Sequence, residues 1–301
     1  MYRESDSPDR TPLIGSGLLR ALLCLIFYLM LWQVVQRIFL ASVASLSVDM
    51  DGVIGLGMQQ WFSVLSAFFT IHIPIVITVV VCRLAVDRRP VSTLGLCVDS
   101  IPQTFILGIL LAGGVVCAVF FVLLLLGVVA LKPSGLYLGW SGFAVLTAYH
   151  FVIAFAEELL MRGYLVANLR ASVNRYLAVF ISGVVFAGAH CLNLHLSAVG
   201  AFNLFLMGAA FALYYMEKRN LWLPIGAHWS WNVIQGPVLG YSVSGKGCPS
   251  IIAHSSTGSD LLTGGSFGME GSLLVTGVLT LGPAAAFLLS RRGKERERAV
   301  F

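Results

Sequence analysis

The chain has 301 residues, of which 58% are hydrophobic and only 11% are charged, with a mean hydropathy of +0.88 and a net charge of +5. Soluble domains carry roughly 25% charged residues, so this composition excludes a cytosolic enzyme, a disordered chain and an ordinary nucleic-acid-binding protein. We therefore expect an integral membrane protein with an all-α fold. It should be a polytopic bundle of transmembrane helices that has the lipid bilayer, and no nucleic acid, as its partner.

Apolar segments of spanning length recur eight times along the chain. The first has Arg20 and Arg37 near its ends and could be a signal peptide, but no small-residue cleavage site follows it cleanly, so we count it as a span. The expected spans are residues 18–41, 61–82, 104–131, 143–169, 176–194, 196–216, 221–239 and 272–289.

The distribution of lysine and arginine predicts the orientation of these spans. Sixteen of the nineteen basic residues fall on one side of the membrane when eight spans are counted, and the other side holds only Arg37, Lys132 and Lys246. Because cytoplasmic loops carry the excess of basic residues, we expect both termini to be cytoplasmic. The sixteen are Arg3, Arg10, Arg20, Arg83, Arg88, Arg89, Arg162, Arg170, Arg175, Lys218, Arg219, Arg291, Arg292, Lys294, Arg296 and Arg298.

The same pattern predicts the organisation of the chain. Residues 1–16 and 291–301 are expected to be disordered cytoplasmic tails, the second of them basic. Between them lie N-terminal transmembrane helices at 17–140, a helical core at 141–240, an external Gly/Ser-rich loop or lid at 241–271, and a last transmembrane helix at 272–290. The six cysteines show no CxxC spacing, which argues against a zinc ribbon or a disulfide framework.

Two adjacent acidic residues, Glu157 and Glu158, are the only ones of the fourteen that fall inside a long apolar segment. A carboxylate at the bilayer centre costs roughly 2.5–3.5 kcal/mol on insertion scales and usually has a function. Arg162 follows Glu158 by four residues, so the two share a helix face and can form a salt bridge. Glu157 is rotated by about 100° from that face and is left as the available carboxylate. The alternative is an ion pair that only fixes helix packing.

The next polar residue inside a span is His190. The position midway between 157 and 190 falls in the polar turn at residues 172–175, so a hairpin with its tip there places Glu157 and His190 at equal depth on antiparallel helices. Facing groups at one depth are what a general base and a water-orienting imidazole require. The alternative is a core histidine that is hydrogen-bonded to a backbone carbonyl.

A third pair, His228 and Asn232, is spaced to project from one helix face into the bundle. Trp222, Trp229 and Trp231 surround the pair, so an interfacial aromatic belt is the alternative. His228 lies nine residues from the turn near Arg219, whereas Glu157 lies about 16 residues from the turn at 172–175. The two side chains can therefore lie at one height only if the 172–175 turn extends roughly 10 Å further into the cytoplasm than the turn near Arg219.

These three motifs, EExxxR at 157–162, FxxxH at 186–190 and HxxxN at 228–232, occur in this order within one hydrophobic segment. In that combination the chain resembles the CPBP family, which comprises the CAAX prenyl endopeptidases of the Ras-converting type and the bacteriocin-processing or immunity proteins. The resemblance covers about residues 143–239, which makes the 141–240 core the catalytic part. Residues 263–271 are also similar to a segment of bacterial members.

The resemblance implies an intramembrane endopeptidase, of the glutamic or metallo type, in a bacterial cytoplasmic membrane, acting on a peptide or membrane-protein substrate. It implies that Glu157 is the general base, that His190 orients the attacking water, and that His228 and Asn232 stabilise the oxyanion. Supporting roles are implied for Glu158, Arg162 and Phe186. We expect no metal cofactor, with Glu157, His190 and His228 as the ligands of a zinc ion in the alternative mechanism.

Two other classes of protein are compatible with parts of the sequence. Ser141 lies in a GxSG motif, but it precedes Glu157 by sixteen residues, roughly 24 Å along one helix. A serine that distant from His190 forms no dyad, so we interpret the motif as a helix-entry turn. The other class is a transporter, immunity or scaffold protein that uses the Glu/His pair to bind protons or ions. The sequence leaves the substrate and the oligomeric state open.

Overall fold

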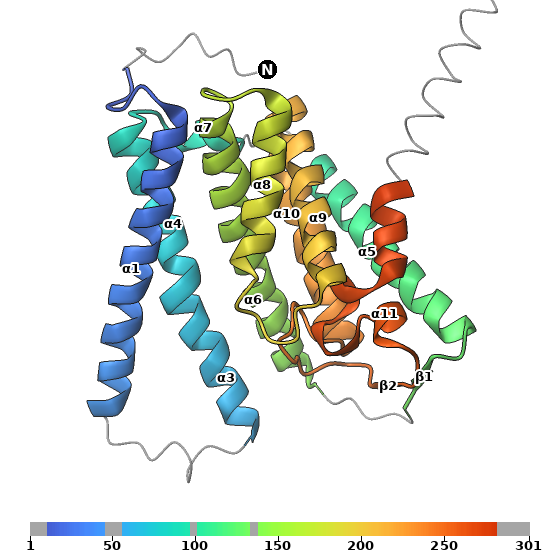
Figure 1. Cartoon of the computed structure of the whole chain (residues 1–301). Helices are drawn as coiled ribbons and strands as arrows, with labels where there is room; N and C mark the ends of the chain where they lie inside the picture. The colour runs from blue at the N-terminus through green and yellow to red at the C-terminus, as the bar shows by residue number, and fades with distance from the viewer. Residues whose placement is uncertain (1–10, 46–55, 97–100, 133–137, 282–301) are drawn as a thin grey trace, which may run out of the picture.

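The computed structural model (Figure 1) describes residues 11–45, 56–96, 101–132 and 138–281 of the chain. Residues 1–10 of the expected N-terminal tail, the expected C-terminal tail at 291–301 and residues 282–289 of the last expected span lie outside these residues. The described part is a bundle of helices that run alternately up and down in the view of Figure 1, with one small sheet at the lower end.

The N-terminal helices follow the apolar segments closely. The helix α1 covers Gly17–Ser45, and a continuous second helix consists of α3 (Leu56–Ala67), the π-helical η1 (Phe68–His72), α4 (Ile73–Val81) and the π-helical η2 (Cys82–Val86). A short 3-10 turn, η3 (Val91–Leu94), precedes α5 (Ile101–Leu125).

The second half of the bundle contains the expected core. A long helix is formed by α6 (Trp140–Glu158), the π-helical η5 (Leu159–Val166) and α7 (Ala167–Leu169). It is followed by α8 (Arg175–Ala189), α9 (Ala198–Lys218), α10 (Trp222–Val233) and the π-helical η6 (Ile234–Val238). Residues 273–281 begin a further helix. The α7–α8 turn coincides with the predicted hairpin tip, where the side chain of Asn174 accepts a hydrogen bond from the Leu177 N–H at 2.9 Å.

Within the described residues, five helices are long and apolar enough to cross a membrane: Gly17–Val43, Trp61–Val86, Ile101–Leu125, Trp140–Leu169 and Ala198–Lys218. The protein is therefore an integral membrane protein. The helix α8 has only 15 residues, about 22 Å of helix, which is shorter than the roughly 30 Å hydrocarbon core. The total of eight spans and the cytoplasmic placement of both termini remain predictions.

In two of the expected spans, the helix ends before the apolar segment does. The third was expected to reach residue 131, but α5 ends at Leu125 and a turn that contains Gly127, with φ +68°, follows it. The strand β1 (Val129–Leu131) then pairs antiparallel with β2 (His254–Ser256), so the all-α prediction is wrong for this small sheet. The fifth was expected to reach residue 194, but α8 stops at Ala189 and leaves Leu192 and Leu194 exposed in the following loop.

The described part of the expected N-terminal tail (1–16) contacts the bundle. Residues 11–16 are described and pack on the bundle, where the Leu13 N–H donates to the Val86 carbonyl at 2.9 Å. The hydroxyl of Ser172 accepts a hydrogen bond from the Leu18 N–H at 3.0 Å. These contacts to the second helix and to the α7–α8 turn satisfy backbone donors near the start of α1, which the sequence alone could not reveal because the partners are distant in the chain.

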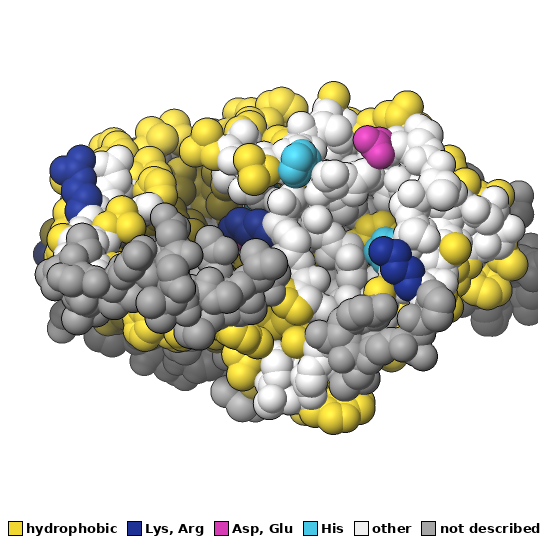
Figure 2. Space-filling view, turned by 90° about the horizontal axis from the view of Figure 1, so that it is seen from below, with side chains coloured by type: hydrophobic (Ala, Val, Ile, Leu, Met, Phe, Trp, Pro, Cys, Tyr) yellow, Lys and Arg dark blue, Asp and Glu magenta, His cyan; other side chains and the backbone are white. Residues whose placement is uncertain are grey.

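Basic residues gather at one end of the bundle. A single pocket near the start of α1 is lined by Arg20, Arg83, Arg89, Arg170 and Arg219. The opposite end, seen from below in Figure 2, shows mainly hydrophobic and uncharged surface with few Lys or Arg side chains in view. This asymmetry agrees with the charge pattern that was used to orient the spans.

The expected external loop at 241–271 is folded tightly against the lower end of the bundle. It contains a short helix, α11 (Asp260–Thr263), and the 3-10 turns η7 (Gly265–Phe267) and η8 (Met269–Gly271). Phe267 and Met269 are buried, and the carboxylate of buried Glu270 accepts hydrogen bonds from the Gln235 side chain and from Ser244. Burial raises the pKa of Glu270, which these hydrogen bonds oppose.

Close backbone contact joins α5 to α10. A Cβ atom added at Gly108 would lie 2.3 Å from the Leu223 carbonyl oxygen, and one added at Gly226 would lie 2.3 Å from the Phe105 carbonyl oxygen. Small residues of this kind allow transmembrane helices to approach closely. Since α10 carries His228 and Asn232, this crossing helps to set the height of the candidate site.

We expect Gly108→Ala to lower the free energy of unfolding by roughly 1–3 kcal/mol, because the new methyl group overpacks the crossing with α10. Gly114→Ala on the same helix is the matched control, since nothing lies within 4 Å of its added Cβ. The control should be neutral or stabilising by up to about 1 kcal/mol. Thermal unfolding of both variants in detergent measures the difference, and equal melting temperatures would contradict the close crossing.

Candidate functional site

A buried ion pair forms the base of the candidate site. Arg162 Nη1 lies 2.7 Å from Glu158 Oε1, and both side chains are 0% exposed. The other terminal nitrogen, Nη2, donates to the Gly208 carbonyl at 3.2 Å, and the guanidinium stacks over Phe186 with 4.6 Å between its carbon and the ring centroid. The predicted salt bridge is therefore confirmed. The assignment of Arg162 to the basic membrane face is wrong, because its side chain lies inside the bundle.

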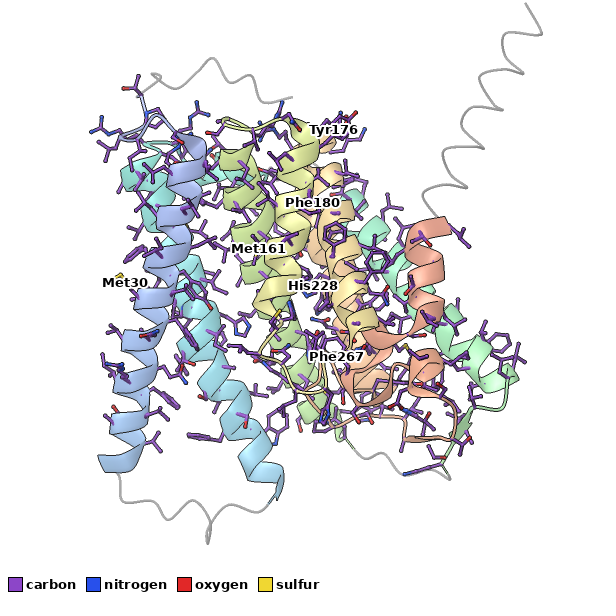
Figure 3. The ribbon with its side chains drawn as sticks, in the orientation of Figure 1. Met30, Met161, Tyr176, Phe180, His228 and Phe267 are labelled. Carbon is purple, nitrogen blue, oxygen red and sulfur yellow. The ribbon has the colours of Figure 1, made fainter. Side chains whose placement is uncertain are left out.

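His228 from α10 lies between the two glutamates of α6. Its Nδ1 is 3.0 Å from Glu158 Oε1, and its Nε2 is 3.9 Å from Glu157 Oε2. Figure 3 shows His228 about halfway along the bundle. The two motifs therefore lie at one height, and the π-helical η5 contributes to this because its wider turns advance less per residue than α-helical turns.

Glu157 differs from its neighbour in exposure and in partners. Its side chain is 22% exposed, whereas that of Glu158 is 0% exposed. Across the part of the chain that the structure describes, the Glu157 carboxylate accepts no hydrogen bond, and it is close enough to His190 and His228 to interact with both electrostatically. The structure therefore agrees with the sequence-based expectation that Glu158 is neutralised by Arg162 and that Glu157 is the available carboxylate.

His190 follows the last residue of α8 and caps that helix. Its Nδ1 lies 2.8 Å from the Phe186 carbonyl oxygen, and the two rings pack with centroids 5.0 Å apart. His190 is therefore hydrogen-bonded to a backbone carbonyl, as the alternative interpretation of a core histidine predicts. Because a carbonyl can only accept, Nδ1 carries a hydrogen. In that tautomer of the neutral ring, Nε2 is an acceptor, and none of the described residues donates to it.

Asn232 lies one helical turn beyond His228 and is 5% exposed. Its side chain has no hydrogen-bond partner among the described residues, so its amide donors are available. The tryptophan-belt interpretation is not favoured, because Trp231 is buried and the Trp229 indole donates to the Thr147 carbonyl at 2.9 Å inside the bundle. The GxSG turn is a helix entry, as expected, since Gly139 is the N-cap of α6.

Protein-family models include one that matches part of this chain. The family described as Type II CAAX prenyl endopeptidase Rce1-like matches residues 138–234. The resemblance to the CPBP family is confirmed. The matched segment contains all three motifs, and it identifies the CPBP-type core of the chain as similar to a family of proteases. No curated protein matches the chain.

Four further residues, three of them outside residues 138–234, interact electrostatically with Glu157, and the sequence motifs do not point to any of them. Electrostatic contact with Glu157 involves Tyr28 of α1, His72 of η1, Tyr149 of α6 and Lys246 of the 241–271 loop. His72 is buried, its Nδ1 lies 3.0 Å from the Ala67 carbonyl oxygen, and its ring packs edge-on against Tyr149. His72 could have been found from the sequence, because it is a polar residue inside the second apolar segment, 61–82.

The zinc alternative requires three side chains that converge on one point. Among the described residues, no group of three or more His, Cys, Asp or Glu side chains is placed to hold a metal ion. Glu157, His190 and His228 therefore do not fit a zinc site in this arrangement. The Nδ1 of His228 lies against Glu158 and the Nδ1 of His190 against a backbone carbonyl, which orients both rings. The expectation that the site works without a metal stays a prediction.

We expect Arg162→Leu to lower the free energy of unfolding by about 3–5 kcal/mol, because it leaves the Glu158 carboxylate buried without its cation. The double variant Glu158→Leu/Arg162→Leu removes both charges and should recover a large part of that loss. Chemical or thermal unfolding in detergent compares the single and double variants. Additive destabilisation in the double variant would contradict the pairing.

Proposed function

We propose that this protein is an intramembrane endopeptidase in which Glu157 and His190 activate a water molecule. The observation that carries the proposal is the unequal state of the two adjacent glutamates. Glu158 is fully buried and paired with Arg162, while Glu157 is partly exposed, has no hydrogen-bond partner among the described residues and interacts electrostatically with two histidines. A carboxylate that pairs with no arginine and accepts no hydrogen bond from the described residues can accept a proton from water.

The proposed reaction is the hydrolysis of a peptide bond. Glu157 takes a proton from the water while His190 Nε2 orients it, and the water oxygen attacks the carbonyl carbon of the substrate. The carbonyl π electrons move to its oxygen and form a tetrahedral oxyanion. Collapse of this intermediate breaks the C–N bond, and the proton held by Glu157 passes to the departing amine nitrogen. The new carboxyl group and the amine are the products.

His228 and Asn232 supply donors for the oxyanion in this proposal. The Nδ1 of His228 is occupied by the Glu158 carboxylate, so the ring can donate from Nε2 at the same time only as an imidazolium. The side-chain amide of Asn232 has N–H groups that no described residue engages. Glu158 and Arg162 position His228, and Phe186 packs against His228 and His190 with ring centroids 6.1 and 5.0 Å apart.

The substrate class follows from the place of the site within the bundle. A peptide must reach a carboxylate between helices, so we propose a membrane-associated substrate, such as a lipidated CAAX-type peptide, a leader peptide or the anchor of another membrane protein. We also propose a bacterial cytoplasmic membrane as the location, with the site open toward the basic, cytoplasmic end. The Rce1-like match supports the peptide class of the substrate.

We expect Glu157→Gln to lower kcat for peptide cleavage by roughly 10²–10⁴-fold, because the amide cannot accept the proton of the attacking water. The melting temperature should stay close to that of the wild type, since no described hydrogen bond to the Glu157 carboxylate is lost. The measurement is the cleavage of a panel of peptides by the purified protein, with product masses locating the broken bond.

Glu217→Gln is the matched control for this experiment. Glu217 is exposed, pairs with Arg175 on the surface and lies outside the candidate site, so its activity should equal that of the wild type. A Glu157→Gln protein that cleaves at the normal rate would refute the proposal. Coupled proton or ion flux in liposomes, without cleavage of any peptide, would instead favour a transporter.

We expect peptide cleavage to survive exhaustive chelation, because the proposed base and donors are all side chains of the chain itself. The purified protein is treated with EDTA or phenanthroline, its metal content is measured, and its activity is compared before and after the treatment. Loss of activity on chelation and its return on addition of zinc would overturn the metal-free mechanism.

A further inference from the structure

A pocket of about 270 Å³ lies at the end of the bundle where α1 begins. Its walls come from segments far apart in the sequence, including the residues before α1, the end of η2, α7 and the turn after α9. Five arginines line it, together with Pro12, Ala167, Asn168 and Ala171. The proposed catalytic chemistry uses none of these residues.

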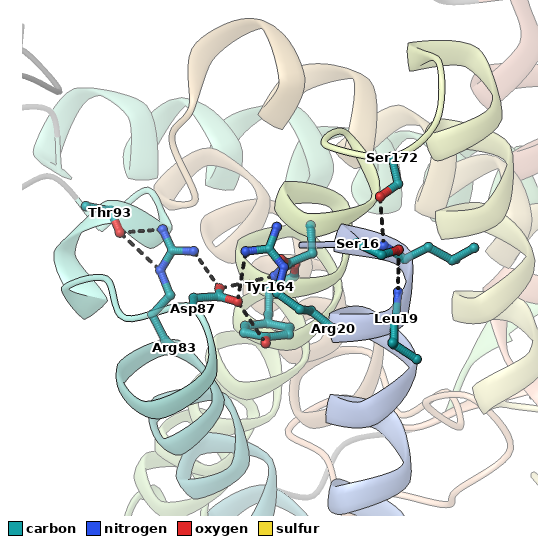
Figure 4. A network of polar contacts seen from close by, with 10 residues as sticks. Ser16, Leu19, Arg20, Arg83, Asp87, Thr93, Tyr164 and Ser172 are labelled. Carbon is teal, nitrogen blue, oxygen red and sulfur yellow. Dashed lines mark hydrogen bonds and ion pairs between the residues drawn. The ribbon is translucent and has the colours of Figure 1, made fainter. Parts of the chain in front are cut away.

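Positive charge exceeds negative charge in this pocket. Asp87 is the buried acid beside it, with 0% exposure, and its Oδ2 accepts a 2.7 Å hydrogen bond from Arg83. Its Oδ1 lies 3.6 Å from Arg20 Nη1. Figure 4 shows both arginines directed toward this one carboxylate, with Tyr164 beside it. One acid therefore serves two arginines, while five arginines line the pocket.

The remaining arginines have no acidic partner in the described part of the chain. Arg89, Arg170 and Arg219 form no ion pair with a described carboxylate, although all three line the pocket. Arg20 also has a buried hydrogen-bond donor that lacks an acceptor. Its side chain is 9% exposed, yet its Nε has no hydrogen-bond partner among the described residues. A buried guanidinium donor without an acceptor is costly.

We propose that this arginine pocket binds a phosphate group. Planar guanidinium groups match phosphate oxygens with paired hydrogen bonds, and several arginines around one small cavity suit a multiply charged anion. The pocket lies where α1 enters the apolar bundle, so the phosphate can come from the head group of an anionic lipid or from a soluble phosphate. Basic pockets between transmembrane helices bind lipid head groups in this way.

The test uses the full-length protein purified in detergent and two probes. Inorganic phosphate is titrated by calorimetry, and phosphatidylglycerol retention is compared with phosphatidylcholine retention by native mass spectrometry. The variant is Arg89→Gln/Arg170→Gln, which removes two exposed charges of the pocket without disturbing the Asp87 contacts. The control is Arg175→Gln, which removes an arginine that does not line the pocket and pairs with Glu217.

We expect the wild type to bind at least one probe, and the double variant to bind it about tenfold more weakly or worse. Arg175→Gln should bind like the wild type, and all three proteins should melt at similar temperatures. Selective retention of phosphatidylglycerol identifies a lipid head group, whereas calorimetric binding of inorganic phosphate identifies a soluble source. Failure of both probes, or equal weakening in the variant and the control, would overturn the proposal.

Discussion

The buried pair of Glu158 and Arg162 is the interaction on which the rest of the candidate site depends. An ionised side chain inside an apolar bundle is costly to bury unless a group of opposite charge lies against it. Here the partner is four residues away on the same helix, at 2.7 Å, with no solvent access to either side chain. Because Arg162 pairs with Glu158, the neighbouring Glu157 is left with no arginine partner and faces the histidines instead.

The same pair connects several helices at the height of the site. Glu158 accepts from His228 of α10, and Arg162 donates to the Gly208 carbonyl of α9 and stacks on Phe186 of α8. A single buried charge pair thus orients one face each of α8, α9 and α10 relative to α6. These contacts explain how the FxxxH motif of α8 and the HxxxN motif of α10 come to lie beside the glutamates, although both are distant from them in the chain.

The π-helical segment η5 links the candidate active site to the arginine pocket. Arg162 on this segment contacts Glu158, while Tyr164, two residues later, donates from its hydroxyl to Asp87 at 3.3 Å. Asn168, in the following α7, also donates to Asp87 and lines the pocket. One continuous helix therefore carries polar groups toward two separate places, the glutamate pair and the arginine pocket.

The sequence by itself determined what depends on local composition and spacing. Apolar run length located the helices, the i,i+4 spacing gave the Glu158–Arg162 pair, and polar residues within apolar runs identified Glu157, His190 and His228. Only the tertiary structure decided the early ends of α5 and α8, the packing of the 241–271 loop, the inward position of Arg162, and the contribution of His72 and Tyr28 to the site. Those features depend on contacts between segments distant in the chain, and such contacts leave no periodic or compositional signal in any one segment.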